Sequence, residues 1–435
     1  MSYQKENDEF LHDFLENSFF RGWKHHEKEF ENFSRIELTF APDCNLDCKY
    51  CYYAQYGDEL WPLEVRSVQS QRKNLATILD FLIDNEYTPE IEFFSGEPLV
   101  TKFGLECLDT ILTRFANVEK KPKAIVIPTN FTFLLHDDKI EEVERLLMKS
   151  NEVGIRTFLS ASFDGKYMEQ NRPFKYGPEV RDDAYYDKCF AFAKKWNCGF
   201  HPMVYSDGIE FWKENFLWFQ AKLKEYELPF DGMYLLEVRD KEWTTKQLEV
   251  YGQFIEFLVE WASEHLGDTD KLVDFILQRG FNILKSAITT VGRGIGCSVQ
   301  SVLFVRMGDL AIIPCHRTSY PAFNYGRFVV EDDKITGVEA GNIALMNTLL
   351  SFKTVAQPYC EKCNIKYLCN GGCLGSQFET NGELFTPIPT VCAMYKQKMI
   401  SLARAYSKVG AYDKLTRLIQ PEKKAALDRI KGGPQ

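Results

Sequence analysis

The stretch that decides the fold reads Arg35-Ile-Glu-Leu-Thr-Phe-Ala-Pro-Asp-Cys44-Asn-Leu-Asp-Cys48-Lys-Tyr-Cys51. Its first part, Arg35 to Phe40, is rich in strand-forming residues and runs into a C-x3-C-x2-C array of cysteines. Three thiolates on one loop are one ligand short of a closed four-ligand metal shell. We therefore expect a metal centre with one open position at the carboxyl end of a strand.

Strand-like and helix-like segments alternate from this first strand onward. The expected strands cover residues 35–40, 90–94, 124–127, 156–162, 199–205 and 233–238. The expected helices between them cover residues 67–85, 103–115, 138–149, 183–196 and 209–226. Such alternation predicts parallel strands joined by crossover helices. Because a notable polar residue follows each strand, we predict an α/β fold, namely a partial (β/α)6 TIM-like barrel that opens onto one shared site.

Other parts of the chain differ from the barrel pattern. Residues 245–296 show a helical pattern, and after them closely spaced cysteines and Gly or Pro punctuation indicate a small domain held by metal. The predicted organisation is a helical extension at 1–34, a barrel at 35–244, a helical bridge at 245–296, a cysteine-rich domain at 297–400, and a C-terminal helix and tail at 401–435.

Composition narrows the class of protein. A net charge of −10 lacks the basic footprint of nucleic-acid binding, and no apolar stretch approaches membrane-spanning length. The N-terminus is acidic where a secretory signal would be basic and then apolar, so we expect a cytoplasmic protein. A reducing compartment disfavours structural disulfides, and metal ligation is the better interpretation of the thirteen cysteines. Cys107, Cys189 and Cys198 lie apart from the arrays and are expected to be ordinary buried thiols.

A second cysteine set follows the helical bridge. Its spacing of x2, x5 and x3 fits poorly with a zinc ribbon, which keeps two C-x2-C pairs well apart. Seven thiolates also exceed one tetrahedral site. The members are Cys297, Cys315, Cys360, Cys363, Cys369, Cys373 and Cys392. For the first array a zinc site is the alternative, although zinc generally uses C-x2-C pairs and closes its shell.

The first array, together with Ser95-Gly96-Glu97-Pro98, resembles the radical S-adenosylmethionine (radical SAM) superfamily. The family's first Gly of that run is Ser95 here. The resemblance implies a 4Fe-4S cluster on Cys44, Cys48 and Cys51 whose open iron binds S-adenosylmethionine, and cleavage of that cosubstrate to a 5'-deoxyadenosyl radical. It implies that Tyr50 lies by the adenine, that Ser162 and Asp164 contact the ribose, and that Arg172 binds the carboxylate. The expected cofactor-binding residues are Tyr50, Ser95, Gly96, Glu97, Pro98, Asn130, Ser162, Asp164 and Arg172.

The second cysteine set resembles the SPASM extension of such enzymes, which houses two auxiliary 4Fe-4S clusters and brings the expected total to three. The family's pairing implies one cluster on Cys360, Cys363, Cys369 and Cys392, and another on Cys297, Cys315 and Cys373. The three-thiolate cluster leads to the hypothesis of an open iron that binds a substrate group such as a peptide thiolate. The rival hypothesis is that His316 caps this iron.

The resemblance implies an enzyme that modifies a ribosomally made peptide by a thioether or carbon–carbon crosslink or a related change. Glu237 at the end of the sixth expected strand is a candidate catalytic base, and a salt bridge with Arg239 or Arg172 is the alternative. The alternative enzymatic function is anaerobic sulfatase maturation, which forms formylglycine. Sulfatase-maturating relatives carry Asp where this chain has His316, and this difference weakens the alternative. A non-catalytic iron–sulfur electron carrier is the alternative from another class.

The partners implied are a peptide or protein substrate and an electron donor such as flavodoxin or ferredoxin. Only 43 residues precede Cys44, so we expect the leader-binding module of many relatives to be a separate protein or unnecessary.

Overall fold

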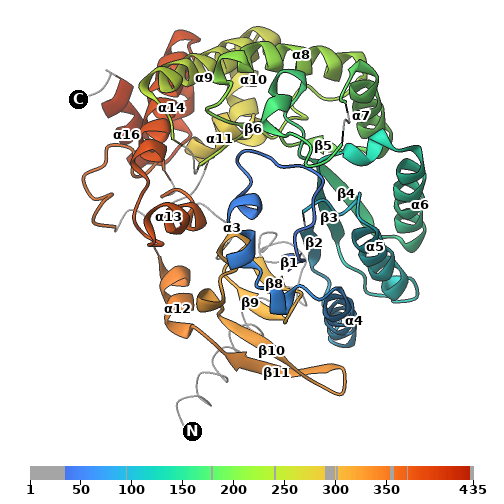
Figure 1. Ribbon diagram of the computed structural model, residues 1–435. Coiled ribbons are helices and arrows are strands. Elements are labelled where there is room, and N and C mark those ends of the chain that lie inside the picture. The colour runs from blue at the N-terminus through green and yellow to red at the C-terminus, as the bar shows by residue number, and fades with distance from the viewer. Residues whose placement is uncertain are drawn as a thin grey trace. The chain divides into compact units, whose positions relative to one another are not determined.

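The computed structural model describes residues 35–94, 96–177, 180–239, 242–289, 299, 302–352, 357–369 and 371–431 (Figure 1). The expected N-terminal helical extension, Ser95 and Cys297 lie outside the described residues. The chain forms two compact units. The first takes the described residues within Met1–Ser162, Phe174–Cys198 and Ser298–Ser351, and the second takes those within Phe163–Pro173, Gly199–Cys297 and Phe352–Gln435.

The first unit is built on a sheet whose strands run in the order β11-β10-β9-β8-β1-β2-β3-β4. Strands β1 to β4 pair in parallel in chain order, as predicted, and β8 also lies parallel to β1. The strands are β1 Arg35–Thr39, β2 Glu90–Phe94, β3 Ala124–Thr129, β4 Arg156–Ala161, β8 Val302–Arg306, β9 Ala311–Ile313, β10 Gly326–Glu331 and β11 Lys334–Ala340.

Helices α4, α5 and α6 lie along one side of these strands (Figure 1). Their N-termini are locally encoded, since Ser67 caps α4 and Thr101 caps α5 by accepting backbone N–H bonds. The helices of this unit are α3 Tyr52–Leu60, α4 Val68–Asp84, α5 Lys102–Phe115, α6 Asp137–Val153, α7 Asp183–Trp196 and α12 Ile343–Ser351. Short helical turns are η2 Leu63–Val65, η3 Thr132–Leu135, η8 His316–Thr318 and η9 Pro321–Phe323.

The two faces of β1 differ in polarity. Ile36 and Leu38 are fully buried, whereas the alternate positions are Arg35, Glu37 and Thr39. On β2, Ile91 and Phe93 are likewise fully buried, and Glu92 stands beside Glu37 in the register. One face of the sheet thus provides a hydrophobic core, and the other carries charged groups in a buried setting.

The second unit contains the last barrel strands and most of the C-terminal helices. The predicted strand at 199–205 is two short strands, because Pro202 between them has no backbone N–H to donate. The predicted strand at 233–238 is reduced to β7, which pairs in parallel with β6. The strands are β5 Gly199–Phe200, β6 Met203–Val204 and β7 Leu236–Glu237.

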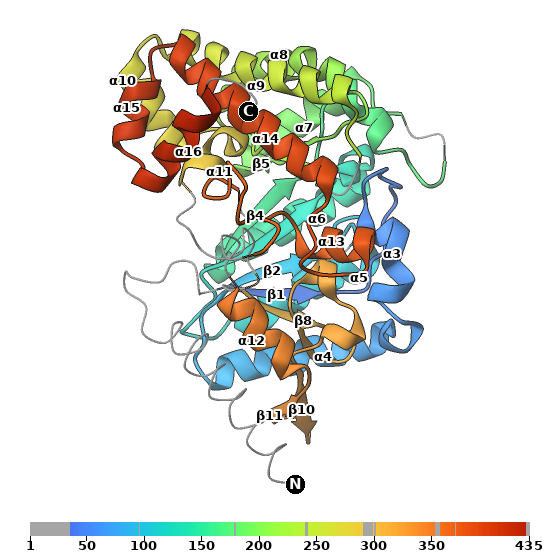
Figure 2. The same cartoon turned by 90° about the vertical axis from the view of Figure 1, so that its left-hand side faces the viewer.

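Helices α9 and α14 lie side by side and carry much of the second unit's core (Figures 1 and 2). A capping box of Thr244 and Gln247 begins α9. The helices are α8 Trp212–Glu225, α9 Thr245–Leu266, α10 Thr269–Asp274, α11 Asn282–Thr289, α13 Leu374–Asn381, α14 Pro389–Lys408, α15 Tyr412–Arg417 and α16 Pro421–Lys431. Shorter helical segments are η4 Lys166–Asn171, η5 Ile209–Phe211 and the π-helical η6 Phe275–Arg279.

The segment after the helical bridge is more regular than its sequence suggested. It contributes strands β8 to β11 to the sheet of the first unit and the long helix α14 to the second. The predicted domain boundaries stay predictions. Among the described residues, no helix has the length and apolarity needed to cross a membrane.

Candidate functional site

Cys44, Cys48 and Cys51 lie on the loop that joins β1 to α3, and all three are half-buried. The loop is tightened by a bond from the backbone N–H of Cys51 to the Cys48 carbonyl, 2.9 Å long. The N–H of Leu46 donates to the Cys44 sulfur over 3.4 Å. Helix α3 begins directly after Cys51, so its N-terminal dipole favours negative charge at this end of the loop.

The segment Gly96-Glu97-Pro98 follows β2 and contacts the cysteine loop through its backbone. The backbone N–H of Glu97 donates to the Asp43 carbonyl over 2.7 Å. A Cβ atom at Gly96 would stand 2.3 Å from the same carbonyl oxygen, which no side chain tolerates. Gly96 is therefore required for the close approach of two backbone segments.

The Glu97 carboxylate joins the ends of two neighbouring strands. It is fully buried and accepts hydrogen bonds from the Thr129 hydroxyl over 2.7 Å and from the Leu99 N–H over 3.1 Å. It also accepts one from the Asn130 N–H. A buried carboxylate that is bonded in this way fixes the backbone it touches.

Asn130 brings the end of β3 to the cysteine loop. Its side-chain amide donates to Asn45 Oδ1 over 3.0 Å and lies 3.9 Å from the Cys44 sulfur. Its own Oδ1 accepts from the Thr132 N–H and hydroxyl, which fixes the amide's orientation. Burial, followed by the nearby Glu97 charge, raises the pKa of Cys44 to about 12. Ligation of a metal would have to displace this proton.

Tyr50 is half-buried on the same loop, and Pro98 is buried beside Glu97. The backbone N–H of Ser162, just beyond β4, donates to the Thr129 carbonyl over 2.6 Å. The first unit therefore gathers Tyr50, Glu97, Asn130 and Ser162 around the three cysteines or at the adjoining strand ends.

Asp164 and Arg172 form a paired group in the second unit. The Nη2 of Arg172 donates a hydrogen bond to Asp164 Oδ1 over 2.9 Å. The Nε of the same guanidinium lies 2.8 Å from Asp164 Oδ2. Asp164 also accepts from the Met203 N–H over 2.8 Å. The residues expected to contact the ribose and the carboxylate of S-adenosylmethionine are thus bonded to each other. His201 lies near this pair, and burial, followed by the Arg172 charge, lowers its pKa to about 4.

Four cysteines of the second set gather in the second unit. Cys360, Cys363 and Cys369 follow one another through short turns, and Cys392 lies in the first turn of α14. Burial is the main cause that raises the pKa of Cys369 to about 11; a hydrogen bond from the Gly371 backbone opposes the shift, and the charges of Cys392, Cys363 and Cys360 add to it. Such mutual influence requires closely spaced sulfur atoms. Cys373 precedes α13 in the same unit.

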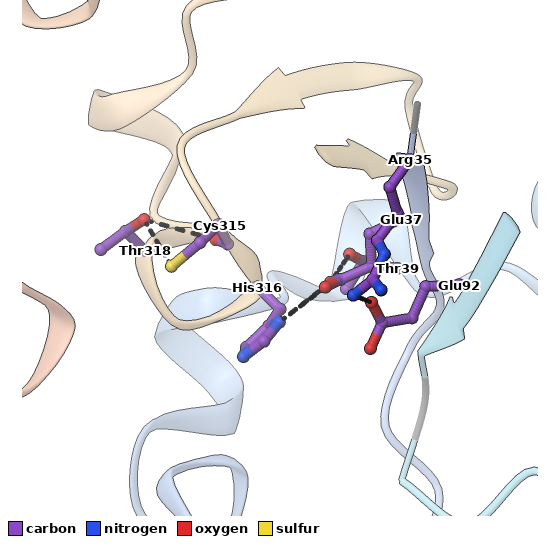
Figure 3. Close-up of polar contacts among 7 residues, drawn as sticks. All are labelled: Arg35, Glu37, Thr39, Glu92, Cys315, His316 and Thr318. Atoms are coloured by element: carbon purple, nitrogen blue, oxygen red, sulfur yellow. Dashed lines mark hydrogen bonds and ion pairs between the residues drawn. The ribbon is translucent and has the colours of Figure 1, made fainter. Parts of the chain in front are cut away.

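Cys315 lies in the first unit at the start of η8, where its sulfur accepts from the Thr318 hydroxyl over 3.3 Å. The neighbouring His316 points toward β1 and its Nδ1 lies 2.9 Å from Glu37 Oε1 (Figure 3). The His316 ring stacks on Phe94 with 4.2 Å between centroids and 4° between planes. Because Nδ1 contacts Glu37, only Nε2 of His316 could bind an iron. The rival hypothesis that His316 caps the iron stays a prediction.

The buried group of Glu37 and Glu92 escaped the sequence interpretation. Burial, followed by the Glu37 charge, raises the pKa of Glu92 to about 7, and the Arg35 guanidinium opposes this shift. Arg35 lies 3.0 Å from Glu92. Acidic residues at alternate positions of two adjacent strands were the available signal, since one face of such strands must point inward.

Glu237 is almost completely buried at the end of β7 and is held in place by two donors. Lys398 Nζ lies 2.5 Å from Glu237 Oε1, and the Tyr251 hydroxyl donates to the same oxygen over 2.8 Å. Burial alone would raise the Glu237 pKa, but the charges of Lys398 and Arg239 and the hydrogen bonds from Lys398 and Tyr251 outweigh it and lower the pKa. The salt-bridge partner is Lys398, which the sequence interpretation had not named. The catalytic role of Glu237 stays a prediction, and this fixed ion pair favours a structural one.

The donor chemistry of both cysteine groups fits iron–sulfur ligation, because each presents several partly buried thiols within one short loop or turn region. In the described part of the chain, no three His, Cys, Asp or Glu side chains surround the position of a single metal ion. A cubane spaces its ligands farther apart than a single ion does.

Comparisons with known proteins agree with this architecture. Residues 34–176 match the Fer4_12 family, described as a 4Fe-4S single cluster domain. A search of curated proteins gave no match. The solved structure of native anSMEcpe with bound AdoMet is 18% identical, covers 86% of this chain and 99% of its own, and has a TM-score of 0.56. Native anSMEcpe with bound AdoMet and Kp18Cys peptide is 17% identical, with coverage of 86% and 99% and a TM-score of 0.54.

Streptococcus suis SuiB bound to S-adenosylmethionine is 13% identical, with coverage of 82% and 77% and a TM-score of 0.47. The chain shares the fold of the anSMEcpe structures, a mixed α/β fold with a large sheet of mainly parallel strands in its first part. The predicted α/β fold class is thereby confirmed, and the 4Fe-4S domain match and the AdoMet-bound anSMEcpe structures agree with the resemblance noted in the sequence.

Proposed function

We propose that this protein is a radical SAM enzyme that modifies a peptide. The observation that carries the proposal is the loop of Cys44, Cys48 and Cys51, fixed by Gly96, Glu97 and Asn130 from two adjacent strand ends. Structural support of this kind, drawn from distant parts of the sequence, is expected of a site whose geometry matters. A plain zinc-binding turn would need no such array of polar strand ends.

The three thiols of the loop are the proposed ligands of a 4Fe-4S cluster. When bound, the cluster supplies an electron and an open iron for S-adenosylmethionine, which yields the hydrogen-abstracting 5'-deoxyadenosyl radical. The protein's own part is to desolvate the Cys44 thiol, to donate the Leu46 N–H to its sulfur, and to place the Asn130 amide beside it. Hydrogen bonds to cluster sulfurs adjust reduction potential.

The cosubstrate contacts proposed are the backbone around Gly96, the ring of Tyr50 and the side chains of Asn130 and Ser162. Asp164 holds Arg172 by two contacts, so the pair can act as one positioning unit in which Arg172 retains a donor for a carboxylate. Asp164 also anchors β6 through Met203 N–H, which links this pair to the barrel framework.

Two auxiliary 4Fe-4S clusters are proposed as well, for a total of three. Cys360, Cys363, Cys369 and Cys392 are the proposed ligands of one, and their mutual electrostatic influence supports this grouping. Cys297, Cys315 and Cys373 are the proposed protein ligands of the other. The open iron proposed there would take a substrate group such as a peptide thiolate.

The substrate class proposed is a ribosomally made peptide that receives a thioether or carbon–carbon crosslink or a related modification. The proposal has support from anSMEcpe, whose structures include one with a bound peptide. Flavodoxin or ferredoxin is the proposed electron donor, a separate protein is proposed for any leader recognition, and the cytoplasm is the proposed location. A second candidate function, anaerobic sulfatase maturation, is favoured by the fold that the chain shares with anSMEcpe, an anaerobic sulfatase maturase.

The test is anaerobic reconstitution of the full-length protein, followed by iron counting and assay of 5'-deoxyadenosine after reduction with S-adenosylmethionine present. We expect about twelve irons per chain, the content of three cubanes, and about eight in a Cys44→Ala/Cys48→Ala/Cys51→Ala variant. The variant should form no 5'-deoxyadenosine. Formation of this product by the triple variant would refute the proposal, and its absence from the wild type would favour an electron carrier.

A Cys- or Ser-containing sulfatase peptide separates the two enzymatic candidates. Conversion of its target residue to formylglycine would establish sulfatase maturation instead of peptide crosslinking. Crosslinking of a small Cys-, Trp- or Tyr-rich peptide encoded beside this protein's gene would establish the first candidate.

A further inference from the structure

Arg239 follows β7 by two residues and is a half-buried cation with unused hydrogen-bonding capacity. Its Nε is buried and has no hydrogen-bond partner among the described residues. The aromatic ring of Tyr395, with its centroid 5.9 Å from the guanidinium carbon, is a neighbour that can stabilise the cation. An arginine carries five N–H donors in a fixed fork, and leaving a buried donor unpaired is costly.

The nearby carboxylate does not balance this charge. Glu237 is already neutralised by Lys398 and further bonded by Tyr251, at 2.5 Å and 2.8 Å. Counting one negative charge for Glu237 and one positive charge each for Lys398 and Arg239 leaves this group with a net charge of plus one. Among these three side chains, one positive charge is unmatched.

The surroundings define the kind of anion that would fit. Cys373, a proposed cluster ligand, is close enough to act on Arg239 electrostatically, and so is Tyr234, whose side chain is 51% exposed. One neighbour of Arg239 therefore faces solvent, and the Tyr395 ring supplies an aromatic neighbour. A planar guanidinium in such a setting matches a carboxylate, which it can bind through two parallel N–H bonds. The end of a barrel strand is also where ligands of this architecture collect.

We propose that Arg239 binds a carboxylate of the peptide substrate, supplied by an acidic side chain, next to the auxiliary cluster ligand Cys373. This inference rests on the proposed peptide-modifying function. The carboxylate of S-adenosylmethionine is the other source of the same chemistry. Arg172 is already held by Asp164, whereas Arg239 is not held by any described carboxylate, so the two arginines are separable by mutation.

The experiment measures binding to reconstituted full-length protein by fluorescence anisotropy with three synthetic pools of labelled octapeptides. The pools are randomised identically, except that one fixed position holds Glu, Gln or Lys. We expect the wild type to bind the Glu pool about tenfold more tightly than the Gln pool, as expected for a charge-assisted pair. Arg239→Gln should abolish this preference, and Arg239→Glu should transfer it to the Lys pool.

Arg239→Lys and Arg404→Gln are the matched controls. Arg239→Lys keeps the charge without the fork and should retain part of the preference, which guards against misfolding of the other variants. Arg404 is an exposed arginine on α14, and its replacement by Gln should leave the preference unchanged. Iron content and circular dichroism are recorded for every variant.

Equal binding of the Glu and Gln pools by the wild type, or binding of neither, would overturn the inference. So would an Arg239→Gln variant that loses affinity for S-adenosylmethionine while it keeps the peptide preference. A shift in cluster reduction potential with the preference intact would make Arg239 a counter-cation of the cluster and would also overturn it. Absence of 5'-deoxyadenosine from the wild type refutes the proposed function instead, and that assay is independent of the pool preference.

Discussion

The two cysteine regions of this protein are shaped in different ways. The loop of Cys44 to Cys51 is held by Gly96, Glu97 and Asn130, which come from other parts of the chain. In the later region, the backbone N–H groups of Cys360, Cys363 and Cys369 bond to carbonyls only three or four residues earlier. The first region is therefore fixed by tertiary contacts, whereas the second is a run of local turns that a ligand has to complete.

The two kinds of support have different consequences for the two regions. A site that is rigid before its cluster arrives can set the geometry of a reaction, because its support does not depend on the metal. A region closed by ligation contributes folding free energy when the metal binds.

Removal of iron by anaerobic chelation should separate the two regions most clearly. We expect residues 357–373 to lose protection from hydrogen exchange because their own bonds are local, and strands β1 and β2 to keep theirs. Peptide-level exchange mass spectrometry before and after chelation provides the measurement. Equal loss of protection in both regions would show that the first loop also needs its metal.

Glu237→Gln should be the most damaging single change in the second unit. It leaves Lys398 buried without a counter-charge, at a cost of about 3–5 kcal/mol in the free energy of unfolding. Urea unfolding measures the change, and Glu237→Gln/Lys398→Met should recover most of it. This recovery would show that the cost comes from the unpaired Lys398 charge in the core of the second unit.

The pair of Glu260 and Lys408 is a surface control, because it also places a lysine of α14 against a glutamate, here one on α9. Glu260→Gln should change stability by only about 0.5 kcal/mol. If Glu237→Gln is as harmless as Glu260→Gln, the buried pair has no structural role, and the catalytic prediction for Glu237 gains support.

Gly96→Ala should damage the first region alone. The added Cβ would meet the Asp43 carbonyl oxygen at 2.3 Å, and we expect a loss of about 1–3 kcal/mol together with the iron of one cluster. Gly57→Ala in α3 is the control, since nothing lies within 4 Å of its Cβ and alanine favours the helix. Retention of full iron by Gly96→Ala would mean that the Asp43 contact does not shape the loop.

Glu92→Gln should have a smaller effect that depends on pH. The Glu92 pKa is raised from 4.5 to about 7, so the protonated side chain is favoured in the folded state. Its contribution to stability is fully present below about pH 4.5 and is lost as the pH rises through 7. Glutamine stays neutral, so for each pH unit between about pH 5 and 6 the variant should lose about 1 kcal/mol less stability than the wild type. Parallel pH profiles of unfolding would contradict this assignment.

The fold was predictable wherever a segment's pattern is local. Strand β2 and helix α7 have the predicted bounds, because alternation and helical periodicity act over a few residues. The pairing of β8 with β1 was not predictable, since it joins segments that are far apart in the sequence. The contact between His316 and Glu37 was not predictable for the same reason, although the sequence had indicated His316 as a possible iron ligand.

The sequence by itself determined the chemistry: the spacing of the thiols, the alternation of strands and helices, and the polar residues that follow the strands. Only the tertiary structure decided which charged groups neutralise one another. It paired Arg172 with Asp164 and Glu237 with Lys398, and it left the Arg239 donor at Nε without a partner among the described residues. The reason is physical, because residue type and spacing are local properties, whereas the choice of a partner in a buried site depends on packing between distant segments.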